Sequence, residues 1–175
     1  MARPVPPFRA DHVGSLLRPD SVKAARKARF QDHTLDAAGL KAVEDEAIKD
    51  AVALQKSVGL KVATDGEYRR SWWHYDFMGM LTGLDIVTRE GGGIQFKGVH
   101  TNPQVPAITG KLDFPDDHPM LDHFRYLDSV SGDAVMPKIS IPGPSACHFR
   151  VQKQDIAPKE YHDPEVLFAD LAKTY

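Results

Sequence analysis

The feature that most constrains the fold is a long amphipathic segment that is followed at once by a short apolar one. Between residues 34 and 59, apolar side chains recur every three or four positions, which predicts a helix with Thr34 as its N-cap and Gly59 as its stop. Residues 60–66 then predict a buried strand, and residues 8–14 an earlier one. The order strand, helix, strand predicts a parallel pair with a right-handed crossover. The apolar stripe consists of Leu40, Val43, Ala47, Ala51, Leu54 and Val58.

Two carboxylates emerge where the second expected strand ends. Asp65 and Glu67 flank Gly66, which allows a sharp turn that residues with a Cβ resist. Ligands bind at the carboxyl ends of strands in parallel α/β folds, so this turn is the strongest site candidate in the chain. The alternative is a solvated acidic turn beside Arg69 and Arg70, and this stretch alone does not decide between the two.

The middle of the chain departs from the strand and helix alternation. Apolar residues at 86–87 and 94–96 flank the triple glycine 91–93, which predicts a hairpin, with a further extended segment at 105–112. We interpret residues 83–114 as an insertion after the second strand. The aromatic segment 71–81 begins a helix or a loop, and each of its rings is expected in the core rather than against a ligand.

Three more helices and one more strand complete the expected elements. Helices are predicted over 21–30, over 119–130 and from Pro164, where Asp163 is the expected cap. A third strand over 135–141 runs into a rigid Pro-Gly-Pro turn at 142–144. Roughly three strand–helix units and a hairpin fit this length, whereas a closed eight-stranded barrel needs about 250 residues. The chain therefore resembles the N-terminal part of a longer fold, and a complete small α/β domain is the alternative.

Composition narrows the class of protein. The chain has 175 residues, 42% of them apolar, and a formal charge of -2, so we expect neither a nucleic-acid partner nor a membrane partner. The start of the chain lacks the apolar core of a signal peptide, which makes the cytoplasm the expected location. The single cysteine, Cys147, excludes an internal disulfide framework and a cysteine-rich zinc site within this chain.

Three motifs in order resemble one protein family. Residues 11–19 (Asp-His-Val-Gly-Ser-Leu-Leu-Arg-Pro), residues 62–70 (Val-Ala-Thr-Asp-Gly-Glu-Tyr-Arg-Arg) and residues 141–145 (Ile-Pro-Gly-Pro-Ser) are similar to the start of the catalytic barrel of cobalamin-independent methionine synthase. The likeness is strongest to its shorter, single-barrel bacterial relatives. Gly-Ser and Gly-Pro are weak signals singly, but the three motifs at these spacings are fairly specific. The resemblance implies an α/β fold, with residues 1–175 forming the N-terminal part of a (β/α)8 TIM barrel that carries a β-hairpin insertion after the second strand.

The same resemblance implies an activity. The family moves a methyl group from 5-methyltetrahydrofolate to the thiol of homocysteine, and a zinc ion held by His, Cys and Glu ligands activates that thiol. Ser15 with its neighbouring backbone would hold the substrate carboxylate, Glu67 would take the ammonium, and the Gly143-Pro144 turn would lie on the folate side. His12 either lines the pocket or is a hydrogen-bonded structural residue. The candidate substrate-binding residues are His12, Gly14, Ser15, Asp65, Glu67, Gly143 and Pro144.

No catalytic residue or metal ligand is assigned within this chain. The zinc ligands are expected downstream of residue 175, and Cys147, which is followed by His148, is expected to be a packed thiol. His74 is left undecided. The remaining histidines are expected to be solvated, namely His33, His100, His118, His123 and His162.

Other functions remain open at this point. Corrinoid-dependent methyltransferases and other barrels related to uroporphyrinogen decarboxylase use the same superfamily fold, and a thiol other than homocysteine could be the acceptor. A truncated half-barrel without catalysis is the non-enzyme alternative. We expect small-molecule partners, and we expect the isolated 175-residue chain to be metal-free and inactive.

Overall fold

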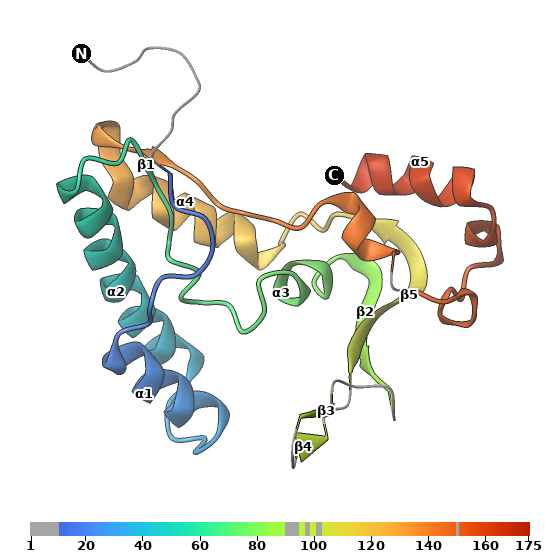
Figure 1. Cartoon of the computed structure of the whole chain (residues 1–175), viewed down its shortest axis with the longest axis horizontal. Coiled ribbons are helices and arrows are strands. Elements are labelled where there is room, and N and C mark those ends of the chain that lie inside the picture. Colours follow the sequence, from blue (N-terminus) through green and yellow to red (C-terminus); the bar gives the residue numbers. More distant parts are fainter. Residues whose placement is uncertain (1–10, 90–94, 97–98, 101–102, 150) are drawn as a thin grey trace. The chain divides into compact units, whose positions relative to one another are not determined.

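The computed structural model describes residues 11–89, 95–96, 99–100, 103–149 and 151–175. It contains both helices and strands in two compact units (Figure 1). The first unit comprises Met1–Arg70 with Leu121–Ser140, and the second comprises Ser71–Met120 with Ile141–Tyr175. None of the helices that these residues form is long and apolar enough to cross a membrane.

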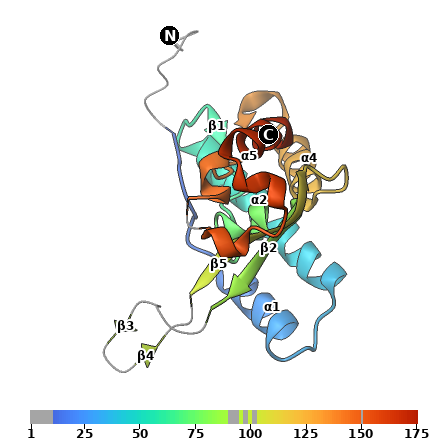
Figure 2. The ribbon, with the colours of Figure 1, turned by 90° about the vertical axis from the view of Figure 1, so that its right-hand side faces the viewer.

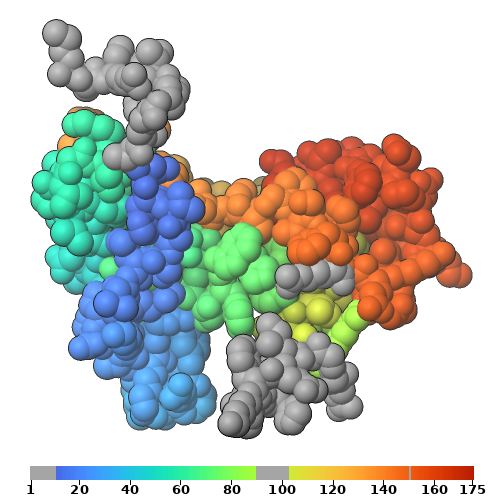
Figure 3. Space-filling view, in the orientation of Figure 1, coloured from blue at the N-terminus to red at the C-terminus, as the bar shows by residue number. Residues whose placement is uncertain are grey.

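Helices dominate the first unit. Helix α1 spans Asp20–Phe30, α2 spans Ala37–Ser57, and α4 spans Pro119–Ser131. The expected long helix is present, but its N-cap is Asp36 rather than Thr34, because the Asp36 carboxylate accepts the Gly39 N–H at 2.7 Å. Residues 11–30 form a continuous strip on the surface of this unit, drawn in blue in Figure 3.

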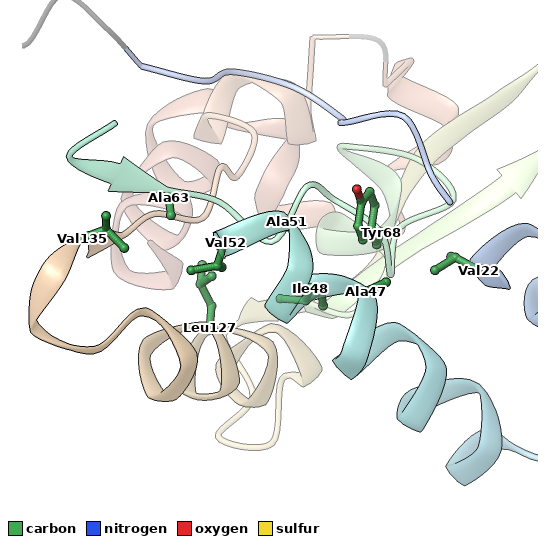
Figure 4. Packing of buried hydrophobic residues seen from close by; sticks show 9 residues of the cluster. All are labelled: Val22, Ala47, Ile48, Ala51, Val52, Ala63, Tyr68, Leu127 and Val135. Carbon is green, nitrogen blue, oxygen red and sulfur yellow. The ribbon is translucent and has the colours of Figure 1, made fainter. Parts of the chain in front are cut away.

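The core of the first unit gathers side chains from elements that are far apart in the sequence. Helix α2 contributes more of them than any other element, and Leu127 of α4 packs against it with no exposed surface (Figure 4). The expected apolar stripe is buried only in part, since Leu54 and Val58 are exposed while Glu44 and Gln55 are buried. The cluster consists of Val22, Ala47, Ile48, Ala51, Val52, Ala63, Tyr68, Leu127 and Val135.

A parallel strand pair lies in this unit, but it joins the second and third expected strands. Strand β1, Val62–Ala63, pairs with β6, Met136–Pro137, in register Val62↔Met136. The expected strand at 8–14 is wrong over residues 11–14, which form no strand, and residues 8–10 lie outside the described part of the chain. The reason is that a side chain holds this segment: the Lys138 ammonium donates to the carboxylate of Asp11 and to the carbonyl of His12.

The second unit contains two antiparallel pairs. Strand β2, Thr82–Thr88, runs beside β5, Gln104–Asp113 (Figure 2), and β3, Gln95–Phe96, pairs with β4, Val99–His100. The triple glycine 91–93 and Ile94 of the expected hairpin lie outside the described residues, and Ile86 and Val87 pair with Pro106 and Val105 of the longer strand β5 rather than with Phe96.

Helix α5 closes the described chain and packs near β5. It spans Pro164–Thr174, and Asp163 is its N-cap, as expected, because its carboxylate accepts the Glu165 N–H at 3.0 Å. The hydroxyl of Tyr161 accepts the Leu112 N–H at 3.0 Å and donates to Asp170 at 2.7 Å, which joins α5 to β5. The short elements are α3 at Tyr75–Met78 and the 3-10 turns η1 at Gly132–Ala134, η2 at Pro144–Cys147, η3 at Lys153–Asp155 and η4 at Lys159–His162.

Two expectations about this unit are wrong. His118 is buried rather than solvated, because its ring is hydrogen-bonded on both sides, to the carbonyl of Phe77 at 3.1 Å and to the N–H of Met120 at 3.2 Å. Trp72 and Trp73 are more than half exposed rather than packed in the core, and both contact the His74 imidazole. The burial of His118 depends on Phe77, which lies 41 residues away in the sequence.

Candidate functional site

The turn after β1 is a buried and strained structure. Asp65 is 3% exposed and Glu67 is 8% exposed, so the alternative of a solvated acidic turn is wrong. Gly66 and Glu67 both have positive φ, at 66° and 56°. A left-handed conformation costs a residue with a Cβ about 1 to 2 kcal/mol, and such strain persists only where the surroundings hold it. The side chains of Thr64 and Asp65 contribute, because they accept the N–H groups of Gly66 and Glu67 at 3.2 and 2.9 Å.

A glutamine from α2 fixes the beginning of this turn. The Gln55 amide oxygen accepts the Thr64 N–H at 3.0 Å, and its nitrogen donates to the carbonyls of Thr64 and Ala51 at 2.8 and 3.0 Å. Gln55 is buried, and its amide therefore satisfies backbone groups that a neighbouring strand would otherwise pair. Sequence reasoning missed this residue. The only available signal was a polar side chain near the apolar face of the predicted helix.

The Gly-Ser motif lies directly against the turn. The Leu16 N–H donates to the Gly66 carbonyl at 3.1 Å, and the Ser15 hydroxyl approaches the same oxygen at 3.3 Å. Gly14 has a φ of 91°, and its carbonyl accepts a hydrogen bond from the His12 ring at 2.7 Å. The structure thus brings Ser15 together with Asp65 and Glu67, while Ser15 itself stays exposed.

Arg18 joins the same two segments. Its guanidinium donates to the carbonyl of Glu67 at 2.7 Å, to that of Tyr68 at 3.2 Å and to that of Arg70. The Tyr68 hydroxyl donates in the opposite direction, to the carbonyl of Leu17 at 3.3 Å. The turn that carries Glu67 is therefore held by side chains as well as by its own backbone.

Charged side chains surround the turn on the helical side. Arg70, whose side chain is 3% exposed, places Nη1 4.0 Å from Glu67 Oε1, beyond hydrogen-bonding distance. Arg69 contacts Glu44 at 3.3 Å and also contacts Asp45. Burial raises the pKa of Glu44 despite the attraction of Arg69 and Arg26. Burial also acts on Asp45, but hydrogen bonds from Lys41 and Arg69 outweigh it and hold the Asp45 pKa below its usual range.

His123 on α4 belongs to the same neighbourhood. The expectation that it is solvated is wrong: the ring is half-buried, and burial lowers its pKa to about 4. The charges of Arg69 and Arg70 lower the pKa further, and that of Asp65 opposes them. The imidazole is thus neutral at pH 7. Its position three residues before Tyr126, whose ring lies under the Arg69 guanidinium, places it on the inner face of α4.

The remaining candidates divide between the two units. Lys138, at the carboxyl end of β6, holds Asp11 at 2.6 Å and the His12 carbonyl at 2.7 Å, and sequence reasoning did not single it out. Gly143 and Pro144 belong to the second unit, where both are exposed and Pro144 is the first residue of η2. The first unit alone therefore brings together His12, Gly14, Ser15, Asp65 and Glu67.

The described residues do not form a zinc site. Among them, no three His, Cys, Asp or Glu side chains are grouped so that they could hold a metal ion. Cys147 is fully buried, its sulfur lies 3.5 Å from the Tyr175 hydroxyl, and burial raises the pKa of its thiol. A protonated, enclosed thiol is a poor metal ligand, which agrees with the expectation of a packed side chain.

Comparison with known proteins places this mixed α/β chain among longer bacterial proteins. No family model matches it. It is 43% identical to the uncharacterized protein YxjG of Bacillus subtilis (strain 168), over 100% of this chain and 45% of that protein. It is 44% identical to the uncharacterized protein YxjH of the same organism, over 97% of this chain and 43% of that protein. The chain thus spans less than half the length of these curated relatives.

A solved structure extends the likeness to the fold. The chain is similar to a Listeria monocytogenes protein that is provisionally named a vitamin-B12 independent methionine synthase, with a TM-score of 0.78 and 38% identity. The match covers 99% of this chain and 47% of that one. The similarity supports the family suggested by the three sequence motifs.

Proposed function

We propose that this chain supplies part of the amino-acid pocket of a methyltransferase that transfers a methyl group from 5-methyltetrahydrofolate to homocysteine, or to a related thiol, and so gives methionine. The observation that carries the proposal is the buried, left-handed Glu67 beside Ser15. A carboxylate in such a place is costly unless a cation meets it, and the α-ammonium of an amino acid is a suitable one.

The contact between Glu67 and Arg70 is compatible with this role. The Arg70 guanidinium lies at 4.0 Å and so neutralises part of the charge of Glu67 without a hydrogen bond to that oxygen. A substrate ammonium would form the charge-assisted hydrogen bond. Ser15 and the backbone around Gly14, on the opposing segment, would take the substrate carboxylate.

The proposal includes the remainder of the barrel. We infer that β1 and β6 are two neighbouring strands of a (β/α)8 barrel, with residues 83–114 inserted after the first of them. The parallel pairing and the similarity to a solved chain about twice as long support this inference. Zinc does not fit the described residues of this chain, so we place its ligands elsewhere in the protein. We also propose a cytoplasmic location and small-molecule substrates.

Replacement of Glu67 tests the pocket. In the full-length protein, we expect Glu67→Gln to weaken L-homocysteine binding about 10- to 100-fold, the effect of losing one charge-assisted hydrogen bond, and to leave zinc content unchanged. Titration calorimetry and metal analysis measure the two quantities. The matched control is Glu46→Gln, which removes an exposed carboxylate paired with Lys49 on α2. Normal homocysteine binding by Glu67→Gln would show that Glu67 does not hold the ammonium.

A further inference from the structure

The Arg18 guanidinium makes an unusual set of contacts for a partly exposed side chain. Nη2 donates to the carbonyl of Glu67 at 2.7 Å and also to that of Arg70, and Nε donates to the carbonyl of Tyr68 at 3.2 Å. Nη1 lies 3.5 Å from the Ser15 hydroxyl. One side chain thus contacts both segments of the proposed pocket.

We infer that Arg18 is a positioning residue, which holds Glu67 in its left-handed conformation and so directs the Glu67 carboxylate. The inference rests on the proposed function only for the identity of the ligand, an α-amino acid. The contacts between Arg18 and the turn do not depend on that function. Arg18 acts through the backbone of the turn, because its N–H groups are directed at protein oxygens.

The hydrogen bonds on both sides of Glu67 show how Arg18 completes the set of contacts that fixes its conformation. The Glu67 N–H is held by the Asp65 carboxylate at 2.9 Å, and the Glu67 carbonyl accepts both the Arg18 guanidinium at 2.7 Å and the Arg70 N–H at 3.1 Å. Because both peptide groups are fixed, the φ of 56° at Glu67 is imposed by the surroundings and does not reflect the intrinsic preference of glutamate.

Only an arginine can make this set of contacts. The guanidinium is planar and presents its donors in a fixed fork, so it can reach three neighbouring carbonyls at once. A lysine at this position would keep the charge, but its ammonium is a compact group that cannot span the same three oxygens. Arg18→Lys therefore removes the geometry and preserves the charge.

A double-mutant cycle on ligand affinity tests the inference. In the full-length protein, we expect Arg18→Lys to weaken L-homocysteine binding roughly tenfold, and we expect no further loss when the same change is made in Glu67→Gln. The control is Arg125→Lys, which alters an exposed arginine paired only with Asp122 among the described contacts of α4. An equal loss in both backgrounds, or no loss in either, overturns the inference.

A second cycle needs no ligand. Glycine adopts a positive φ without penalty, so Glu67→Gly relieves strain only while Arg18 imposes that conformation. We expect the change in melting temperature caused by Glu67→Gly to be less favourable in the Arg18→Lys background than in the wild type. Equal changes in both backgrounds overturn the positioning role. If neither the wild type nor any variant binds homocysteine, the proposed function is wrong. The melting-temperature cycle then still tests the positioning role of Arg18.

Discussion

Two turns at expected strand ends have opposite characters. The Asp65-Gly66-Glu67 turn is buried and is held by side chains from α2 and from residues 15–18. The Gly143-Pro144 turn is exposed, and the N-cap of the 3-10 turn that it begins is Gly143, which has no side chain to cap it. Both turns lie in motifs that resemble the same family, so a motif locates a turn, whereas the contacts around it decide whether the turn is a pre-organised site.

The largest expected effect comes from the charged network behind the buried turn. Arg69→Met leaves the buried Glu44 carboxylate without one of its two arginines and also removes the contact with Asp45. Breaking a buried ion pair by removing one partner costs about 3 to 5 kcal/mol of unfolding free energy, and because Arg26 still pairs with Glu44 we expect a loss at the lower end of that range. Urea unfolding measures the loss, with Arg125→Met as the exposed control. A loss as small as that of the control would mean that the network does not support the turn.

A smaller loss is expected from the glutamine on α2. Gln55→Leu preserves the volume but leaves the buried N–H and carbonyl of Thr64 without their partner. The expected cost is about 1 to 3 kcal/mol for each buried group left unsatisfied. Thermal unfolding compares this variant with Gln154→Leu, a replacement of an exposed glutamine in the second unit. Equal melting temperatures for the two variants would contradict the role given to Gln55.

The pH dependence of stability tests the environment of His123. Its pKa in the folded chain, about 4, lies below the usual value of 6.5, so the unfolded chain binds the proton first as the pH falls. Stability should therefore decrease between about pH 6.5 and 4, and His123→Gln should reduce that decrease. Urea midpoints measured across this range, with His162→Gln as the exposed control, give the difference. An unchanged pH profile in His123→Gln would place the ring in solvent.

The smallest effect is expected at the exposed turn. Pro144→Ala should change the free energy of unfolding by no more than about 0.5 kcal/mol, as is usual for surface positions away from special contacts. Thermal unfolding of this variant beside Gln55→Leu measures the contrast between the two turns directly. A loss comparable to that of Gln55→Leu would remove the distinction on which the comparison rests.

The sequence predicted what depends on neighbours along the chain. The periodic stripe located the helix that became α2, Asp163-Pro164 located the start of α5, and Gly66 located the acidic turn. These features are local, because caps, stripes and glycine turns act within a few residues. The predicted site residues remain predictions, although the structure groups five of the seven in one unit.

What could not be predicted depends on contacts between distant segments. Arg18 meets its carbonyls 49 to 52 residues away, and Lys138 reaches Asp11 across 127 residues. The inward position of His123 depends on how α4 packs, and the register of β2 with β5 pairs Ile86 with Pro106 across the intervening β3 and β4. No pattern in the local sequence encodes these pairings.

The backbone and the proposed chemistry make different demands at residue 67. A left-handed φ favours glycine, asparagine or aspartate and penalises β-branched residues most, whereas binding an ammonium requires a carboxylate of suitable length. A library selected for folding and a library selected for ligand binding should therefore rank substitutions at this position differently. The more the two rankings differ, the more folding stability the chain gives up in order to place a glutamate at position 67.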